Sequence, residues 1–462
     1  MKSTKLNLFD LTMIVVSLVI GMGIFRTPVN VAKEAGSADM FFIAWIVGGI
    51  VALCGALTYA EIGSRYPVTG GYYKIFSYCY HPSVAFAINC IILVSNAASL
   101  AGVALIGSEY LANILFKGQE STNTIKLTIS TIAILLFYGV NLLGLKMSAR
   151  AQNVLTIIKI GLVLLLISAL FTGDYASTFT FSVPGEGNTT WTSYLKAFGA
   201  CLVAVSFTYG GYQQTINFGG EVQNAPKIMP RAIFFGITII MLLYLAINYT
   251  YFTVIGFGPL KESESIAAIL AGAIFGSKGF TILSILLFLS VLAYVNVLLM
   301  SNPRVMYAMS EEGVLPAIFK KKNNKTNVMV TSLSTFAALC ILTLFYAKTF
   351  DMILNYTIFL DSIGMATSAA TIFILRNRAR RGIGQEGLTS STEKNGKQSI
   401  YKMSLYPLMP VIFIGTYLFV GTSIAINTPK AAWVSLMIFS AFFILYFVLR
   451  GFKPRQNQIT RI

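Results

Sequence analysis

The sequence is poor in charged residues and has almost no histidine. Only 11% of its 462 residues are charged and 56% are hydrophobic, whereas soluble globular domains are roughly 25% charged. This composition excludes an ordinary soluble domain and indicates a polytopic membrane protein. The single histidine, His81, stands beside Pro82 in a polar turn, so a histidine-based metal site or nucleophile–base pair lacks the residues it needs.

Cysteine is also scarce, and recognisable catalytic motifs are absent from the sequence. The five cysteines have no metal-binding spacing, and their odd number within apolar segments argues against a disulfide framework; they are Cys54, Cys79, Cys90, Cys201 and Cys340. The chain contains no Gly-x-x-x-x-Gly-Lys-Ser/Thr sequence for ATP phosphates, no His-Glu-x-x-His motif and no paired aspartates at membrane depth. We therefore expect no metal, no cofactor and no enzymatic activity.

Apolar runs of about 20 residues or more recur along the chain. They predict twelve transmembrane helices, near residues 8–32, 40–63, 83–115, 124–145, 149–172, 192–218, 231–256, 279–307, 327–347, 350–375, 404–426 and 431–449. The net charge of +17 comes from Lys and Arg that follow the loops on one side of these helices, as the positive-inside rule requires for cytoplasmic termini. We expect an all-α protein of the cell membrane, with the lipid bilayer around it and no nucleic-acid partner.

The expected organisation is one transmembrane domain, formed by residues 1–426 and 431–449. Residues 376–403 are rich in Gly, Ser, Thr and Lys and predict a flexible cytoplasmic loop, with a regulatory or anionic-lipid contact as the alternative. Residues 404–449 predict two appended helices, and residues 450–462 a cytoplasmic tail. Residues 266–274 predict a short amphipathic helix on the outer face.

Two of the apolar segments are interrupted by glycines at their midpoints. The first interruption is Gly21–Gly23, followed by Pro28, and the second is Gly210–Gly211, followed by two glutamines. A membrane helix satisfies its backbone internally, so a break is tolerated only where the freed backbone lines a protein cavity. Close packing of small residues is the alternative for the first segment alone. Two breaks in corresponding halves instead predict the central binding site of a transporter.

The second break lies five spans after the first, in the opposite orientation. Residues 8–172 and 192–375 therefore predict a 5+5 inverted repeat with broken helices 1 and 6. The half-helix that follows a break presents unpaired N–H groups and the positive end of its dipole. An anion such as a carboxylate suits that position.

Motifs along the chain resemble the amino acid–polyamine–organocation (APC) superfamily, and within it the L-type amino acid transporter branch. They span roughly the first two thirds of the sequence in the family's order and are Ile20–Phe25, Ala60–Gly63, Arg65–Tyr72, Phe207–Tyr212, Glu221, Asn224–Arg231, Asn296 and Glu312–Pro316. The resemblance implies the LeuT-like fold, shared with sodium-coupled neurotransmitter-type transporters. It also implies transport of α-amino acids across a cytoplasmic membrane.

The resemblance further implies where a substrate is bound. Its carboxylate is expected at the backbone N–H groups of Met22 and Gly23, and its ammonium group at unwound carbonyls of both breaks. The expected substrate-binding residues are Val19, Ile20, Gly21, Met22, Gly23, Phe207, Thr208, Tyr209, Gly210, Gly211 and Tyr212.

Three of these side chains carry specific expectations. Phe207 is a candidate gate over the substrate, with an ordinary packing role as the alternative. Tyr212 stands where close relatives often carry Trp and is expected to form the pocket floor. Met22 stands where the family commonly has a small polar residue, so no side-chain hydroxyl reaches the carboxylate there.

Lys159 is a cation inside the fifth apolar segment. It lies nine residues after Arg150, which is about 13 Å further along the helix into the membrane at 1.5 Å per residue. A functional role is therefore the default hypothesis for this residue. In the resembling family this lysine stands where sodium-coupled relatives hold a sodium ion, bridging helices one and eight. We expect a coupling role for Lys159 and Asn296, either as a proton carrier or as a fixed surrogate for sodium, with a structural strut as the alternative for Lys159.

Three acidic residues need separate interpretations. Asp361, in the tenth span, either lines the permeation path or is a hydrogen-bonded structural carboxyl group. Glu61 and Glu221 stand near the ends of their helices and predict an inner gate of ion pairs, with Arg231 or Arg304 as partners.

The function predicted from these features is secondary active transport of neutral L-amino acids by alternating access. Lys159 argues against sodium, so exchange and proton symport remain open, with protons as a further partner. Neither broken motif holds an acidic residue, which disfavours cationic side chains. The alternatives are a membrane receptor, an intramembrane enzyme, or a transporter of polyamines or other amines. The preferred amino acid, the direction of flux and any oligomeric partner are left open.

Overall fold

The structure is a computed structural model that describes residues 5–116, 123–173, 191–263, 265–345, 350–382 and 400–451. Side chains are described throughout these ranges except at 350–358 and 451. The described chain is helical and has no β-strand beyond two isolated bridges, Leu6 with Val222 and Thr69 with Phe218. The expectation of an all-α protein is therefore confirmed for the described residues.

The first half of the chain contains α1 Leu8–Val19, η1 Gly23–Phe25, α2 Thr27–Ala35, α3 Ala38–Arg65, α4 Gly71–Cys79, α5 Pro82–Leu115, α6 Asn123–Leu142, α7 Leu145–Ile167, η2 Ser168–Phe171, α8 Trp191–Tyr209, η3 Tyr212–Asn217 and η4 Gly219–Glu221. The second half contains α9 Ala225–Ile255, α10 Phe257–Glu262, α11 Ile266–Phe275, η5 Gly276–Lys278, α12 Gly279–Glu311, η6 Ala317–Lys320, α13 Val330–Phe345, α14 Phe350–Arg380, α15 Leu408–Asn427 and α16 Pro429–Gly451.

Nine helical stretches within the described residues are long and apolar enough to cross a membrane, with α11 and α12 counted as one. Two shorter apolar helices, α1 and α13, are also present. The short helix predicted at residues 266–274 exists as α11 and buries Ile266, Ala267, Leu270 and Ala271. The twelve-helix count and the inverted repeat stay predictions.

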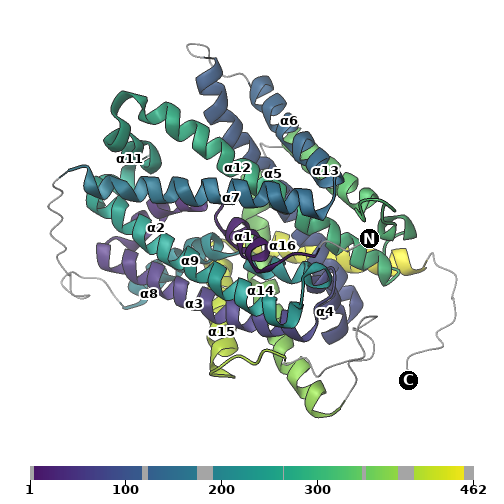
Figure 1. Cartoon of the computed structure of the whole chain (residues 1–462). Coiled ribbons are helices and arrows are strands. Elements are labelled where there is room, and N and C mark those ends of the chain that lie inside the picture. The colour runs from purple at the N-terminus through teal and green to yellow at the C-terminus, as the bar shows by residue number, and fades with distance from the viewer. Residues whose placement is uncertain are drawn as a thin grey trace.

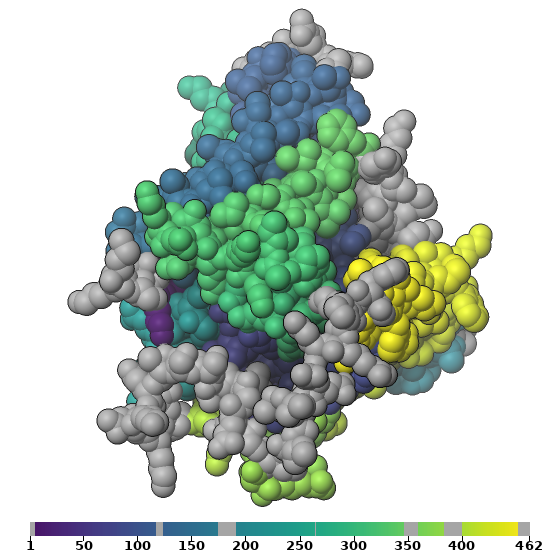
Figure 2. Space-filling view, turned by 90° about the vertical axis from the view of Figure 1, so that its right-hand side faces the viewer, coloured from purple at the N-terminus to yellow at the C-terminus, as the bar shows by residue number. Residues whose placement is uncertain are grey.

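The helix α1 lies in the middle of the bundle (Figure 1). It packs against α7, α9 and α12, while α3 packs against α8 and α9. On the face shown in Figure 2, the blue α6, the green α13 and the yellow α16 form much of the surface. The helices α7, α9 and α12 therefore surround the helix that leads into the first predicted break.

Both predicted breaks are present in the backbone. The helix α1 begins with a capping box between Asn7 and Asp10 and ends at Val19, and helical structure resumes only at η1 and α2. The helix α8 ends at Tyr209, and Gly211 adopts a φ of 114° before η3. This left-handed conformation favours glycine.

The predicted loop at residues 376–403 differs from the structure at both ends. The helix α14 continues to Arg380, and residues 400–403 pack against the end of α3 through hydrogen bonds to Ser64 and Glu61. Residues 383–399, the centre of this predicted loop, lie outside the described residues, as do residues 452–462 of the predicted tail.

Candidate functional site

The two breaks lie directly against each other. A Cβ added to Gly211 would lie 2.3 Å from the carbonyl oxygen of Leu18, and one added to Gly23 would lie 3.3 Å from Cγ2 of Thr208. The close approach of Gly211 to α1 therefore requires a residue without a side chain. The structure thus brings together the backbone segments that the sequence placed at one site.

The first break leaves backbone donors without intramolecular partners. The N–H of Ile20 donates to Val16 O at 2.9 Å and that of Gly21 to Val19 O at 2.8 Å. Within the described chain, the N–H groups of Met22 and Gly23 make no such bond. Free N–H groups at the start of a half-helix favour an anion, which is the chemistry expected for these two residues.

The second break is closed by local hydrogen bonds. The N–H of Gly210 donates to Phe207 O at 3.2 Å, and the N–H of Gly211 donates to Oε1 of Gln213 at 2.9 Å. The Thr208 hydroxyl bonds back to Ala204 O at 2.9 Å. The Thr208 side chain is therefore engaged within α8, although its Cγ2 faces Gly23.

The aromatic side chains of the second break point in different directions. Phe207 is 47% exposed, as a gate or a lipid-facing residue would be. Tyr209 is buried and packs against Trp45 and Tyr244.

Tyr212 is placed differently from its expected position on the pocket floor. It is fully buried and forms a T-shaped ring contact with Tyr59 of α3, at a centroid distance of 6.0 Å. A Cβ added to Gly55 would lie 2.2 Å from its hydroxyl oxygen and 2.3 Å from a ring carbon of Phe413. Its side chain is thus enclosed by α3 and α15. The direction of a residue just after a break could not be read from sequence position.

Lys159 joins the end of α1. It is 1% exposed, and its Nζ donates to Ile20 O at 2.6 Å and to Oγ of Ser17 at 3.3 Å. The Ser17 hydroxyl in turn donates to Ala293 O of α12 at 3.3 Å. The ammonium group therefore lies at the negative end of the α1 dipole and reaches α12 through Ser17.

Asn296 lies in a separate polar network. Its Nδ2 donates to Oε1 of Gln152 at 2.8 Å and to Ser148 O at 3.2 Å, and its Oδ1 accepts from Asn141 at 2.9 Å. Gln152 then donates to Thr156 at 3.1 Å. The network joins α6, α7 and α12, so Asn296 contacts neither break directly.

A carboxamide cluster beside the second break was missed in the sequence. Asn96 donates to Asn302 at 2.7 Å and accepts from Gln214 at 3.3 Å, and Ser301 bonds both Gln214 and Asn217 at 3.3 Å. A small hollow is lined partly by members of this cluster; its lining residues are Tyr72, Asn89, Ile92, Gln213, Gln214, Asn217, Asn302 and Val305. Asparagines at membrane depth were the available signal, because polar residues there are commonly functional.

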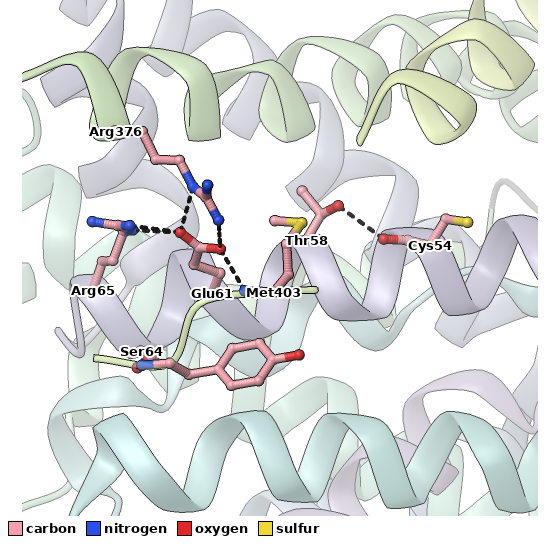
Figure 3. A network of polar contacts seen from close by, with 8 residues as sticks. Cys54, Thr58, Glu61, Ser64, Arg65, Arg376 and Met403 are labelled. Carbon is pink, nitrogen blue, oxygen red and sulfur yellow. Dashed lines mark hydrogen bonds and ion pairs between the residues drawn. The ribbon is translucent and has the colours of Figure 1, made fainter. Parts of the chain in front are cut away.

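Glu61 is the centre of an ion-pair cluster at the end of α3. Its carboxylate accepts from Arg65 at 2.6 Å, from Arg376 at 2.6 Å and from the N–H of Met403 at 2.8 Å, as Figure 3 shows. Burial and the charge of Glu61 raise the pKa of Tyr401. The partners of Glu61 are thus neither Arg231 nor Arg304.

Glu221 pairs with Arg304, one of the two partners predicted from the sequence. Its Oε2 accepts from Arg304 at 2.6 and 2.7 Å, and the Arg304 guanidinium lies over the ring of Phe218. The backbone of Leu6, in front of α1, bonds both Glu221 and Gln223. Arg231 is exposed and forms no ion pair within the described part of the chain.

Asp361 is exposed, although neighbouring residues of α14 are buried. Met365 and Ser368, which follow at helical spacing and share its face, are both buried against Tyr59 of α3. An acidic residue on the same face of α14 as buried residues is compatible with both interpretations of Asp361. Its role stays a prediction.

Sequence comparisons with known proteins identify the family of this chain and several relatives. A sequence profile of the family described as "Amino acid permease" matches residues 6–449. The chain is 28% identical to the serine/threonine exchanger SteT of Bacillus subtilis, over 97% of this chain and 96% of that protein. It is 28% identical to the human large neutral amino acids transporter small subunit 2, over 79% and 68% of the two chains. It is 26% identical to the human cystine/glutamate transporter, over 80% and 74%.

Proposed function

This chain belongs to the amino acid permease family, and from that premise we propose that it carries neutral L-amino acids across the cell membrane by alternating access, without sodium. Membership confirms the resemblance drawn from the motifs and makes the chain a membrane transporter rather than an enzyme. The observation that carries the proposal is the contact between the two breaks, with free N–H groups at Met22 and Gly23.

A zwitterion fits the chemistry of the two breaks. The carboxylate binds the free N–H groups of the first break, and the ammonium group binds carbonyls that the breaks leave unwound. No acidic side chain lies within Val19–Gly23 or Phe207–Tyr212, and the nearby polar cluster consists of uncharged carboxamides. Neutral side chains therefore need no counter-charge at this site.

Lys159 supports independence from sodium. Its ammonium group already bonds Ile20 O at the end of α1, where unwound carbonyls coordinate a cation in the broken-helix transporters. A second cation at about 4 Å would be repelled by about 4 kcal/mol at an effective dielectric of about 20. The segment Leu292–Asn296 of α12 also lacks a Ser/Thr pair that could supply hydroxyl ligands.

Alternating access requires one side of the site to close while the other opens. The Glu61 cluster joins α3 to α14. The Glu221–Arg304 pair joins η4 to α12, beside the N-terminal arm, whose Leu6 bonds Glu221. With cytoplasmic termini, these contacts form the closed inner gate. Transport then breaks them in each cycle and exposes the two breaks to the cytoplasm.

Uptake into proteoliposomes tests the proposal directly. Liposomes that contain the purified protein are loaded with unlabelled serine or leucine, in a buffer where choline replaces sodium. They should take up the same amino acid, labelled, from outside in exchange for the unlabelled one. Lysine and glutamate should compete poorly. Absence of amino acid uptake under every internal and external condition contradicts the proposal, and strong inhibition by lysine contradicts the neutral specificity.

Proton symport is the second candidate mechanism, because Lys159 is a buried amine that touches the first break. Exchange requires an internal amino acid, whereas symport does not. Uptake into empty liposomes driven by an inward pH gradient selects symport. Uptake that occurs only with internal amino acid selects exchange.

A further inference from the structure

Asn89 of α5 is a fully buried amide whose oxygen has no hydrogen-bond partner among the described residues. Its Nδ2 donates to Ala85 O at 2.8 Å. A backbone carbonyl can only accept, so this bond fixes which atom of the carboxamide is the nitrogen and leaves Oδ1 on the other side. A buried amide oxygen without a donor is costly, and buried groups of this kind are satisfied by ordered water where there is room for it.

Asn89 lines the small hollow that the carboxamide cluster also lines in part. This hollow is about the size of one water molecule, which excludes an amino acid. Asn89, Ile92 and Asn96 follow one another at i, i+3 and i+7 and so share one face of α5. The first two line the hollow, and Asn96 bonds Asn302 and Gln214, which line it as well.

Three further amides bring unused hydrogen-bonding groups to the lining. Gln213 Oε1 accepts from the N–H of Gly211 at 2.9 Å, and its Nε2 has no partner in the described part of the chain. Gln214 uses one N–H of its amide within the cluster, and Asn302 Oδ1 accepts one bond there, although an amide nitrogen has two protons and an amide oxygen two lone pairs. The hollow is therefore lined by free acceptors at Asn89 and Asn302 and by free donors at Gln213 and Gln214.

A lining that mixes donors and acceptors suits water better than an ion. The N–H groups of Gln213 and Gln214 would repel a cation, and the oxygens of Asn89 and Asn302 would repel an anion. No charged side chain is among the described residues that line the hollow. A water molecule both donates and accepts, and two to four polar partners are sufficient to hold it.

We propose that the hollow is a binding site for one ordered water molecule, which donates to Asn89 and Asn302 and accepts from Gln213. The water thereby joins α5 and α12 to η3. It also holds the Gln213 carboxamide, whose oxygen binds the N–H of Gly211 in the second break. Binding of the water is a property of the folded chain, whereas its effect on the substrate rests on the proposed transport function.

Asn248 of α9 provides a matched control. It is also fully buried, its Nδ2 donates to Tyr244 O four residues earlier at 2.7 Å, and its Oδ1 has no partner within the described residues. Asn248 thus repeats the local geometry of Asn89, but it is not among the residues that line the hollow. Asn248→Leu therefore removes the same buried amide as Asn89→Leu without removing a partner of the proposed water.

X-ray radiolytic labelling, read by mass spectrometry, tests the water without any substrate. Hydroxyl radicals formed from a bound water oxidise the side chains beside it even where bulk solvent does not reach. Tyr72 and Tyr73 are adjacent and both buried, but only Tyr72 lines the hollow. In the wild type, Tyr72 should be labelled about tenfold faster than Tyr73, because a buried water stays beside it.

The two leucine variants assign the water to its partners. Asn89→Leu should abolish the excess labelling of Tyr72, and Asn248→Leu should preserve it. Equal labelling of Tyr72 and Tyr73 in the wild type overturns the site, and this comparison needs no variant, so it decides the question even if Asn89→Leu does not fold. An unchanged excess in Asn89→Leu overturns the assignment of Asn89 as a partner of the water.

Hydrogen–deuterium exchange tests the link from the water to the second break. In Asn89→Leu, exchange in peptides covering residues 208–215 should become about tenfold faster, as expected when a buried hydrogen bond is lost. Asn248→Leu should match the wild type there. Unchanged exchange in an Asn89→Leu protein that has lost the Tyr72 labelling overturns the holding of Gln213 by the water.

Transport kinetics test the effect on the substrate. Asn89→Leu should raise the KM for the transported amino acid about tenfold, and Asn248→Leu should leave it unchanged. An unchanged KM in Asn89→Leu overturns the contribution of the water to substrate binding. If the wild type transports no amino acid, the proposed function fails, while the labelling experiment still decides whether the water is bound.

Discussion

Single glycines determine how closely the two broken helices approach. Gly211 combines a φ of 114° with a position where a Cβ would lie 2.3 Å from Leu18 O. Gly210, beside it, has ordinary backbone angles, and a Cβ there would lie 3.3 Å from Phe207 O. Two adjacent glycines that look alike in the sequence therefore have different tolerances for a side chain.

We expect Gly211→Ala to lower the rate of amino acid uptake at least tenfold. The added methyl group must displace α1 at the first break. In addition, the left-handed backbone conformation costs an alanine about 1 kcal/mol relative to glycine. Gly161→Ala on α7, where an added Cβ would have no atom within 4 Å, is the control and should retain most of the activity. Uptake and surface expression of both variants provide the measurement. Equal activity of the two would show that the breaks are further apart than in the structure.

Tyr212→Trp should affect stability rather than specificity. The larger ring has to fit between Gly55 and Phe413, and overpacking of such a site costs about 1–3 kcal/mol. We expect a lower melting temperature of the purified protein and an unchanged rank order of alanine, leucine and phenylalanine as competitors. A changed rank order would restore Tyr212 to the pocket.

The position of Lys159 inside an apolar segment can be read directly from the sequence, and Lys159 is buried in the structure. The partners of Tyr212 could not be predicted, because the direction of its side chain depends on how the chain turns at Gly211 after α8. Sequence position places a residue on a helix, but only packing between helices shows which neighbour it contacts.

At the scale of helices, the described contacts show how α1 is attached along its length. Asn153 donates to Asp10 at 2.7 Å, Thr156 to Met13 O at 3.4 Å and Lys159 to Ile20 O at 2.6 Å. The donors recur every three residues along α7, which places them on one helical face. The half-helix α1 is therefore joined to α7 by polar contacts from its first turn to its last.

The ends of α3 and α14 are joined by the buried charge of Glu61. Glu61→Gln should destabilise the protein by about 3–5 kcal/mol, because it leaves Arg65 and Arg376 without their buried counter-charge. Glu109→Gln is the control, since Glu109 pairs with Lys126 at an exposed site where such pairs contribute at most about 1 kcal/mol. Thermal unfolding of both variants is the measurement. Similar melting temperatures would contradict a structural role for the Glu61 cluster.

The boundary of the predicted loop shows why element ends are hard to read. The composition of residues 376–403 is typical of a polar loop, yet α14 extends to Arg380 and Arg376 faces Glu61. An arginine at the end of an apolar helix looks the same whether it is solvated or paired. Its partner lies 315 residues earlier in the chain, so only the tertiary structure identifies it.

At the scale of the whole molecule, the sequence predicted the positions of both breaks, and the structure places them in contact. Apolar runs interrupted by glycines were sufficient for the positions, because the bilayer permits few ways to interrupt a helix. The number of membrane-spanning helices is harder to determine, since α1 and α13 are shorter than a full span and α11 and α12 follow one another closely. The positions of the breaks were therefore easier to predict from the sequence than the number of spans.

Coupling is a property of the whole transport cycle, and Lys159 is the residue that we expect to control it. Replacement of sodium by choline should leave uptake unchanged, because the Lys159 ammonium group already occupies the carbonyl end of α1. Lys159→Ala should abolish uptake or remove its dependence on pH. Lys126→Ala, at a partly exposed ion pair on α6, is the control and should behave like the wild type.

A steep sodium requirement in the wild type, or full activity of Lys159→Ala at every pH, contradicts the assignment. If Lys159→Ala keeps exchange but loses accumulation driven by a pH gradient, the lysine carries the coupled proton. Substrate binding is then intact, but transport is no longer coupled to the proton gradient.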